Sequence, residues 1–117
     1  MDRIIKPFSY KGTLAINSSK SFFQRALAIS LISESKVQLV GNSNENDILT
    51  ALNICEKAGL CFKKTKNSIK IDGKRTNSKK SISADSGESG FCARVFSVVL
   101  SHLFNDVTIN GLSLIHI

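Results

Sequence analysis

Two short segments of the sequence combine serine or glycine with basic side chains at a spacing that suits anion binding. The first is Ser18-Ser19-Lys20-Ser21, with Arg25 four residues after Ser21. A helix that begins at Ser21 offers free backbone N–H groups and the positive end of its dipole, which attract phosphate. Lys20 adds a mobile ammonium and Arg25 a guanidinium that matches phosphate oxygens. An ordinary helix cap with solvated basic side chains is the equally weighted alternative.

The second segment is Glu88-Ser89-Gly90, followed by Arg94. Glycine permits close approach of the backbone to a ligand, and Arg94 falls one turn into the helix that we expect to follow. The alternative is a turn that contains glycine, followed by a surface arginine. The sequence has neither a Walker A motif nor a GxGxxG motif, which disfavours a nucleotide-binding fold.

Length and charge limit the classes of protein that fit the sequence. The 117 residues suit one small domain or part of a larger one, and their net charge is +7. No window reaches the roughly 18 consecutive apolar residues of a membrane-spanning helix, and the first residues lack the apolar core of a secretory signal. We therefore predict a cytoplasmic protein. The charge favours anionic partners without distinguishing nucleic acid, a membrane surface or phosphorylated metabolites.

The cysteines and histidines do not form a recognisable metal-binding or disulfide pattern. Cys55, Cys61 and Cys92 contain no CxxC pair, which suits a reducing compartment, and we expect three buried or half-buried thiols. His102 and His116 lack other ligand types at zinc-binding spacing. We predict no metal site.

The elements that must position the two basic segments can be predicted from periodicity. Helical and strand-like segments alternate, which is typical of an α/β or α+β layered fold. We expect short strands over residues 3–7 and 12–16. A helix should begin at Ser21, because Ser21 and Gln24 fit a capping box, and should end near Ser33.

A strand over 37–40 and a loop over 41–44 should precede the second helix, which ends at Gly59. Four apolar residues should share one face of that helix: Ile48, Leu49, Leu52 and Cys55. The alternation around Leu60 and Ile71, with turn residues at 65–68, predicts a β-hairpin.

A second unit with the same order of elements should begin after Ser83. The polar loop 85–90 should lead into a helix, since its apolar residues recur at helical spacing. These residues are Phe91, Val95, Val98, Val99 and Leu103. A strand should follow over 107–109.

These segments resemble three ordered motifs of the 3-phosphoshikimate 1-carboxyvinyltransferase (EPSP synthase) family. Residues 12–27 are similar to the family's opening strand, its Pro-Gly-Ser-Lys-Ser loop and its helix with Arg-Ala-Leu. Residues 46–59 are similar to the acidic turn and the helix ending in glycine that follow. Ser89-Gly90 with Arg94 resembles the Ser-Gly-x-x-x-Arg motif, and the resemblance covers about residues 8–111.

The sequence departs from the family pattern at both basic segments. Asn17-Ser18 stands where the family usually has Pro-Gly, and Glu88 and Phe91 replace the commonest Asn and Thr. An acidic Glu88 near an anionic substrate would need a neutralising partner.

The resemblance implies a partial enolpyruvyl transferase-like fold of the α/β (α+β) class. The family fold has two lobes built from βαβαββ units, and this chain would hold about one and a half of them over residues 1–111. We expect residues 112–117 to be a non-native tail, because the Arg-Pro motif with which the family continues does not follow here.

The resemblance also implies an activity. Family members transfer the enolpyruvyl group of phosphoenolpyruvate to the 5-hydroxyl of shikimate 3-phosphate, release phosphate on the route to chorismate and aromatic amino acids, and use no metal or organic cofactor. The complete protein would be a monomer without nucleic-acid or membrane partners. The chain, as an N-terminal fragment, should be inactive alone.

Residue by residue, the resemblance assigns Lys20, Ser21 and Arg25 to shikimate 3-phosphate. Lys20, Gly90 and Arg94 are assigned to phosphoenolpyruvate. Asp47 is expected to be a helix-start residue rather than a catalyst. No catalytic residue is assigned, because the acid/base groups of the family lie in its later half.

Two alternatives remain open. The sister enolpyruvyl transferase that acts on UDP-N-acetylglucosamine shares the fold, but typically has Asn where this chain has Ser21. A small basic nucleic-acid-binding module would explain the charge, although the chain has one tyrosine, no tryptophan and no aromatic-plus-basic motif. Competition between oligonucleotides and shikimate 3-phosphate would distinguish the two classes.

Overall fold

Three helices and five strands form the described part of the chain, residues 2–41, 44–76 and 80–112, in a computed structural model. In chain order they are α1 (Lys20–Ser33), β1 (Val37–Val40), α2 (Asn46–Lys57), β2 (Leu60–Lys64), β3 (Ser68–Arg75), β4 (Ser81–Asp85), α3 (Gly90–Leu103) and β5 (Asp106–Asn110). The prediction of an α+β fold is confirmed. Asn42 and Ser43 of the expected loop, and residues 113–117 of the expected tail, lie outside the described residues.

The first sheet is antiparallel, with β3 between β1 and β2. Ile71 of β3 lies opposite Val37 on one side and Phe62 on the other. Buried Ile69 and Ile71 alternate with exposed residues, as expected of a strand with one face on the core and one in solvent. The backbone N–H of Thr65 donates to the carbonyl of Ser68 at 2.8 Å, which confirms the predicted hairpin.

The second sheet pairs β4 with β5 in parallel. Ile82 lies opposite Val107, and Ala84 lies opposite Ile109. β5 is predicted from the sequence and β4 is not. Only Ile82 and Ala84 are apolar in β4, and its other residues, two serines and an aspartate, resemble the polar loop that follows.

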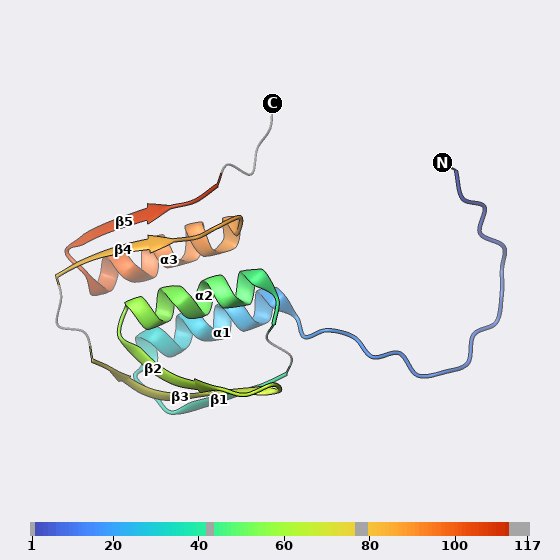
Figure 1. The fold of residues 1–117 in the computed structure, drawn as a ribbon, viewed down its shortest axis with the longest axis horizontal. Coiled ribbons are helices and arrows are strands. Elements are labelled where there is room, and N and C mark those ends of the chain that lie inside the picture. The colour runs from blue at the N-terminus through green and yellow to red at the C-terminus, as the bar shows by residue number, and fades with distance from the viewer. Residues whose placement is uncertain (1, 42–43, 77–79, 113–117) are drawn as a thin grey trace.

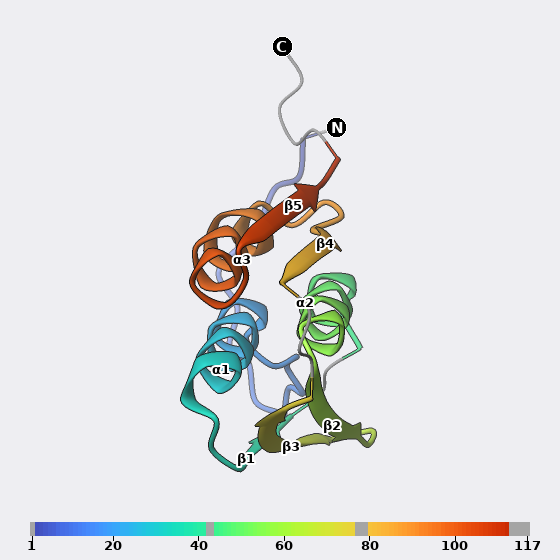
Figure 2. The same cartoon turned by 90° about the vertical axis from the view of Figure 1, so that its left-hand side faces the viewer.

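Two of the helices, α1 and α2, lie between the two sheets (Figures 1 and 2). α1 and α2 cover the inner face of the three-stranded sheet, while α3 and the β4–β5 pair lie on their other side. The core between these layers includes fully buried residues from all three helices: Leu27, Leu31, Ile48, Ile54, Phe96 and Leu100. Burial of these side chains is the main stabilising term for the layered arrangement.

The predicted apolar face of α2 is only partly correct. Ile48, Leu52 and Cys55 are buried, but Leu49 is 41% exposed and Ile54 is buried instead. α2 packs against α1 as well as β2 and β4. Contacts on several sides widen its buried arc beyond the stripe that a single packing surface would require.

The predicted ends of the first two helices are confirmed. α1 ends at Ser33, and the next residue, Glu34, has a φ of 52° in the left-handed region. α2 ends at Lys57, and Gly59 follows with a φ of 94°, a conformation that glycine adopts without steric cost. Within the described ranges, no helix is long and apolar enough to span a membrane.

Residues 2–19 do not form the strands predicted over 3–7 and 12–16. Their apolar side chains are exposed, with Ile4 at 90% and Ile16 at 82%. A strand requires a neighbour that pairs with its N–H and C=O groups. This segment instead leads away from the layers (Figure 1), so it has no pairing partner among the described strands. The alternating sequence therefore predicted strands wrongly here.

Candidate anion-binding site

The three helices begin at the same end of the molecule, where the N-terminal segment joins α1 (Figure 1). Side-chain contacts connect the N-terminal ends of the three helices. Lys20 of α1 pairs with Asp47 of α2, and Gln24 of α1 bonds to Ser89, the cap of α3. Each helix start has unpaired backbone N–H groups and the positive end of a dipole. Their meeting point is suited to a negatively charged ligand.

The first helix is capped two residues earlier than predicted. Ser19 is the cap residue, and its Oγ accepts a hydrogen bond from the backbone N–H of Phe22 at 3.3 Å. Lys20 and Ser21 are therefore the first two residues of the helix. The capping box predicted for Ser21 and Gln24 is wrong, because the Gln24 side chain is buried and directed toward α3.

Lys20 is held over the start of α2 by Asp47. Its Nζ lies 2.9 Å from Oδ2 of Asp47, with the two side chains 49% and 25% exposed. The hydrogen bond and the charge of Asp47 raise the pKa of Lys20 above its ordinary value. Asp47 lies in the first turn of α2, as predicted for a helix-start residue, where a negative charge interacts favourably with the dipole. The ammonium is thus fixed but still accessible.

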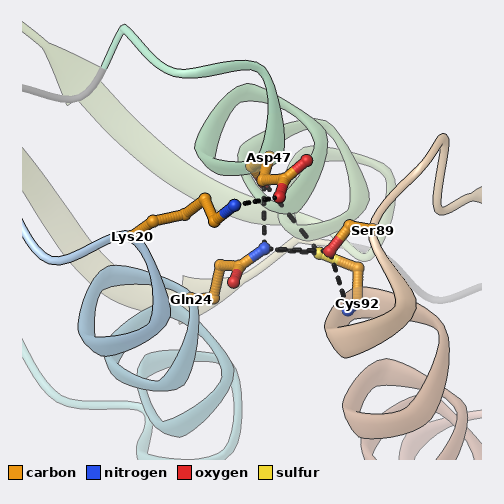
Figure 3. A network of polar contacts seen from close by, with 5 residues as sticks. All are labelled: Lys20, Gln24, Asp47, Ser89 and Cys92. Atoms are coloured by element: carbon orange, nitrogen blue, oxygen red, sulfur yellow. Dashed lines mark hydrogen bonds and ion pairs between the residues drawn. The ribbon is translucent and has the colours of Figure 1, made fainter. Parts of the chain in front are cut away.

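A buried polar network lies beneath this ion pair (Figure 3). The Nε2 of Gln24 lies 3.0 Å from Ser89 Oγ, 3.3 Å from Cys92 Sγ and 3.4 Å from the backbone carbonyl of Asp47. Ser89 Oγ also accepts from the N–H of Cys92 at 3.1 Å, which makes it the N-cap of α3. Burial raises the pKa of the Cys92 thiol, while its hydrogen bonds to Ser89 and Gln24 oppose that rise.

Arg25 lies beside the start of α3. Its guanidinium carbon is 5.6 Å from the centroid of the Phe91 ring, a cation–π distance. Arg25 is exposed, so its N–H donors remain open to solvent. The predicted α1 residues are thereby brought next to the predicted α3 segment, through Phe91, which the sequence analysis had assigned no part in the site.

The α3 residues of the prediction lie at and just after the helix start. Gly90 is the first residue of α3, and Arg94 is exposed one turn later. Within the described ranges, no hydrogen bond or ion pair joins Arg94 to Lys20 or Arg25. Glu88 is likewise exposed and has no ion-pair partner among the residues that the structure describes.

Sequence reasoning missed the central position of Gln24. The residue falls between buried Phe23 and buried Leu27 on α1, so its place in the apolar stripe was a usable signal. A glutamine on a buried helix face needs a polar partner from another element. The capping-box pattern assigned the Gln24 side chain a local backbone partner, so the need for a partner from another element was not recognised.

The cysteines differ in environment. Cys55 and Cys92 are buried as expected, but Cys61 is exposed on β2, which corrects the prediction for that residue. Burial raises the pKa of Cys55 to about 12. Among the described residues, no three His, Cys, Asp or Glu side chains group together in a way that could hold a metal ion.

A separate groove of about 730 Å³ lies along the three-stranded sheet. It is lined by Lys36, Val37, Gln38, Cys61, Phe62, Lys63, Lys70, Ile71 and Asp72. None of the predicted site residues contributes to it. The candidate site is therefore an open surface at the helix starts, not this groove.

Comparison with known proteins identifies the family. The family model for EPSP synthase (3-phosphoshikimate 1-carboxyvinyltransferase) matches residues 5–116. The 3-phosphoshikimate 1-carboxyvinyltransferase of Korarchaeum cryptofilum (strain OPF8) is 28% identical over 95 residues, which cover 81% of this chain and 22% of that relative. The chain thus spans roughly a fifth of the length of this curated relative. Because the family match extends over nearly the whole sequence, the chain belongs to the EPSP synthase family.

Proposed function

We propose that this chain supplies part of the substrate-binding surface for enolpyruvyl transfer from phosphoenolpyruvate to the 5-hydroxyl of shikimate 3-phosphate. The transfer releases phosphate and needs no metal or organic cofactor. The observation that carries the proposal is the meeting of three helix starts around Lys20. Family membership supplies the identity of the two anions. The proposal places the reaction in the cytoplasm.

Shikimate 3-phosphate is assigned to the start of α1. Ser21 and the N–H groups of the first turn would donate to its phosphate, and Lys20 and Arg25 would supply two positive charges. The exposure of Arg25 and its contact with Phe91 support this assignment, because the guanidinium is accessible and already held near the site. A preorganised donor loses less conformational entropy on binding.

Phosphoenolpyruvate is assigned to the space between α1 and α3. Lys20 would contribute from one side, with the N–H of Gly90 and the charge of Arg94 on the other. Lys20 is therefore shared by both substrates. No residue of the chain is assigned as general acid or base, so the chain alone is proposed to bind both substrates without converting them.

Titration of the 117-residue chain with each substrate, followed by amide chemical shifts, tests this proposal. We expect shifts at residues 20–25 with shikimate 3-phosphate and additional shifts at 90–94 with phosphoenolpyruvate. Lys20→Met should weaken both ligands about tenfold, the effect of losing a charge-assisted hydrogen bond. Lys70→Met, which removes the same charge from the exposed face of β3, is the matched control and should change neither affinity.

Three outcomes would count against the proposal. Equal effects of Lys20→Met and Lys70→Met would indicate attraction by net charge alone. Tighter binding of UDP-N-acetylglucosamine than of shikimate 3-phosphate would favour the sister transferase. Salt-sensitive binding of oligonucleotides that shikimate 3-phosphate does not displace would favour a nucleic-acid-binding module.

A further inference from the structure

Gln24 joins the two arms of the proposed site. It is 1% exposed and lies on α1 one turn after Lys20, and its amide bonds to Ser89 at the start of α3. We propose that Gln24 is a positioning residue that fixes the start of α3, and with it the N–H of Gly90, relative to Lys20. This inference rests on the proposed function, because it concerns the geometry of the phosphoenolpyruvate end of that site.

The contacts of Gln24 determine which way its amide faces. The backbone carbonyl of Asp47 can only accept hydrogen bonds, so the NH₂ group of the amide faces Asp47. The same NH₂ group is then directed to Ser89, its shortest contact at 3.0 Å. The NH₂ group of Gln24 therefore links α1 to both α2 and α3 by hydrogen bonds.

The hydrogen bond from Gln24 to Ser89 fixes the position of the start of α3. The Oγ of Ser89 accepts from Gln24 and also from the N–H of Cys92, so it is the atom that caps the helix. Gly90 is the next residue along the chain. Ser89 is only 4% exposed, and hydrogen bonds shielded from water are stronger and more directional than exposed ones. A change at Gln24 is therefore transmitted to Gly90 through one buried oxygen.

A positioning role and a merely structural role predict different effects on the two ligands. Phosphoenolpyruvate is assigned to both helices, through Lys20, Gly90 and Arg94. All residues assigned to shikimate 3-phosphate lie on α1, and α3 contributes only through the exposed contact of Phe91 with Arg25. Loss of a positioning bond should weaken the ligand that spans α1 and α3, whereas general destabilisation should weaken both ligands alike.

The test compares Gln24→Met with Gln38→Met in the full chain. Methionine keeps the length of the side chain and removes its donors, and Gln38 is an exposed glutamine on β1. Gln24→Met should raise the Kd of phosphoenolpyruvate about tenfold, the effect of losing a buried hydrogen bond. In the same variant, the Kd of shikimate 3-phosphate should change by less than about twofold. Gln38→Met should affect neither, and equal weakening of both ligands by Gln24→Met would overturn the proposal.

A pH series with Gln24→Glu provides a rescue test. Near pH 8 the buried carboxylate cannot donate to Ser89 and is repelled by the carbonyl of Asp47. Acidification restores one O–H donor, and burial makes that protonation easier. Phosphoenolpyruvate affinity, taken relative to wild type at each pH, should therefore recover as the pH is lowered. A constant ratio, or the same recovery with Gln38→Glu, would contradict a donor role for Gln24.

Failure of the two proposals can be distinguished. A wild-type chain that binds neither substrate refutes the proposed function. The positioning claim is then decided without ligand, by the amide shifts and hydrogen exchange of Ser89 to Cys92. Gln24→Met should alter these amides and leave those of β1 and β3 unchanged. Unchanged amides at the start of α3 would overturn the inference.

Discussion

The ammonium of Lys20 lies 2.9 Å from a carboxylate oxygen of Asp47, joining the first residue of α1 to the first turn of α2. Both side chains are partly exposed, and ion pairs of this kind add little to stability. The main effect of the pair is on the position of the Lys20 ammonium. A phosphate ligand would find Lys20 already oriented at the helix starts and would compete with Asp47 for it.

Removal of the Asp47 carboxylate should lower the pKa of Lys20. The pair raises that pKa above 10.5 in the folded chain, so its stabilising effect is present below the unfolded value and is lost as the pH rises through the folded value. Asp47→Asn removes the negative charge and should shift the Lys20 titration toward 10.5. Side-chain NMR of lysine Nζ or Cε measures this directly. An identical titration of Lys20 in both proteins would show that the pair is absent in solution.

Replacement of Phe91 by leucine should weaken shikimate 3-phosphate binding. Leucine keeps an apolar contact but has no aromatic face for the Arg25 guanidinium. An exposed cation–π contact contributes about 0.5–1 kcal/mol, so Phe91→Leu should raise Kd by about two- to fivefold. Phe91→Tyr should retain affinity, and Phe22→Leu on the exposed face of α1 serves as the control. Equal affinity of Phe91→Leu and wild type would argue that the ring does not hold Arg25.

The two serine caps should differ in their contribution to stability. Ser89 is buried and accepts two hydrogen bonds, whereas Ser19 is exposed and accepts one. Ser89→Ala should lower the free energy of unfolding by about 2–3 kcal/mol, because the cap is lost and Gln24 keeps only its longer contacts with Cys92 and Asp47. Ser19→Ala should cost only about 0.5–1 kcal/mol. Urea unfolding of both variants gives the comparison, and equal losses would contradict the buried network.

Much of the fold follows from patterns within single segments. The stop of α1 at Ser33, the hairpin around Thr65 and the apolar helix that follows Gly90 all depend on neighbouring residues. Local rules capture such features because their hydrogen bonds close within a few residues. The local rules failed for residues 2–19, because strand formation there depends on a pairing partner that is remote in sequence.

The residues of the proposed site were named from the sequence, and the contacts that connect their helices were not. Lys20 and Arg94 could be named from loop-to-helix spacing and a family resemblance. The contact of Gln24 with Ser89 spans 65 residues, and no local pattern indicates which buried polar groups will meet. The cap of α1 was misplaced for the same reason, since Gln24 satisfied a capping pattern while its side chain was committed to another helix.

Alkaline pH should destabilise the chain through Cys55. Its pKa is raised from 9.0 to about 12 by burial, so the folded state keeps a proton that the unfolded state releases between these values. Stability is therefore unaffected below pH 9.0 and falls as the pH rises toward about 12. The slope of unfolding free energy against pH should be smaller in Cys55→Ala than in wild type.

Thiol labelling provides an independent check on the three cysteines. Exposed Cys61 should react first under native conditions, while buried Cys55 and Cys92 should react only as the chain opens. Cys61→Ser should abolish the fast phase. A fast phase that survives this substitution would show that one of the buried thiols is accessible in the folded chain.

The segment 2–19 ends at Ser19, the residue that caps α1, and Lys20 follows immediately. No spacer separates the exposed apolar stretch from the ammonium that both proposed ligands share. Any contact that immobilises this stretch therefore also restricts the backbone that carries Lys20. Lys20 would then lose part of its conformational entropy before a ligand arrives. Docking of segment 2–19 would therefore tighten ligand binding without adding a new ligand contact.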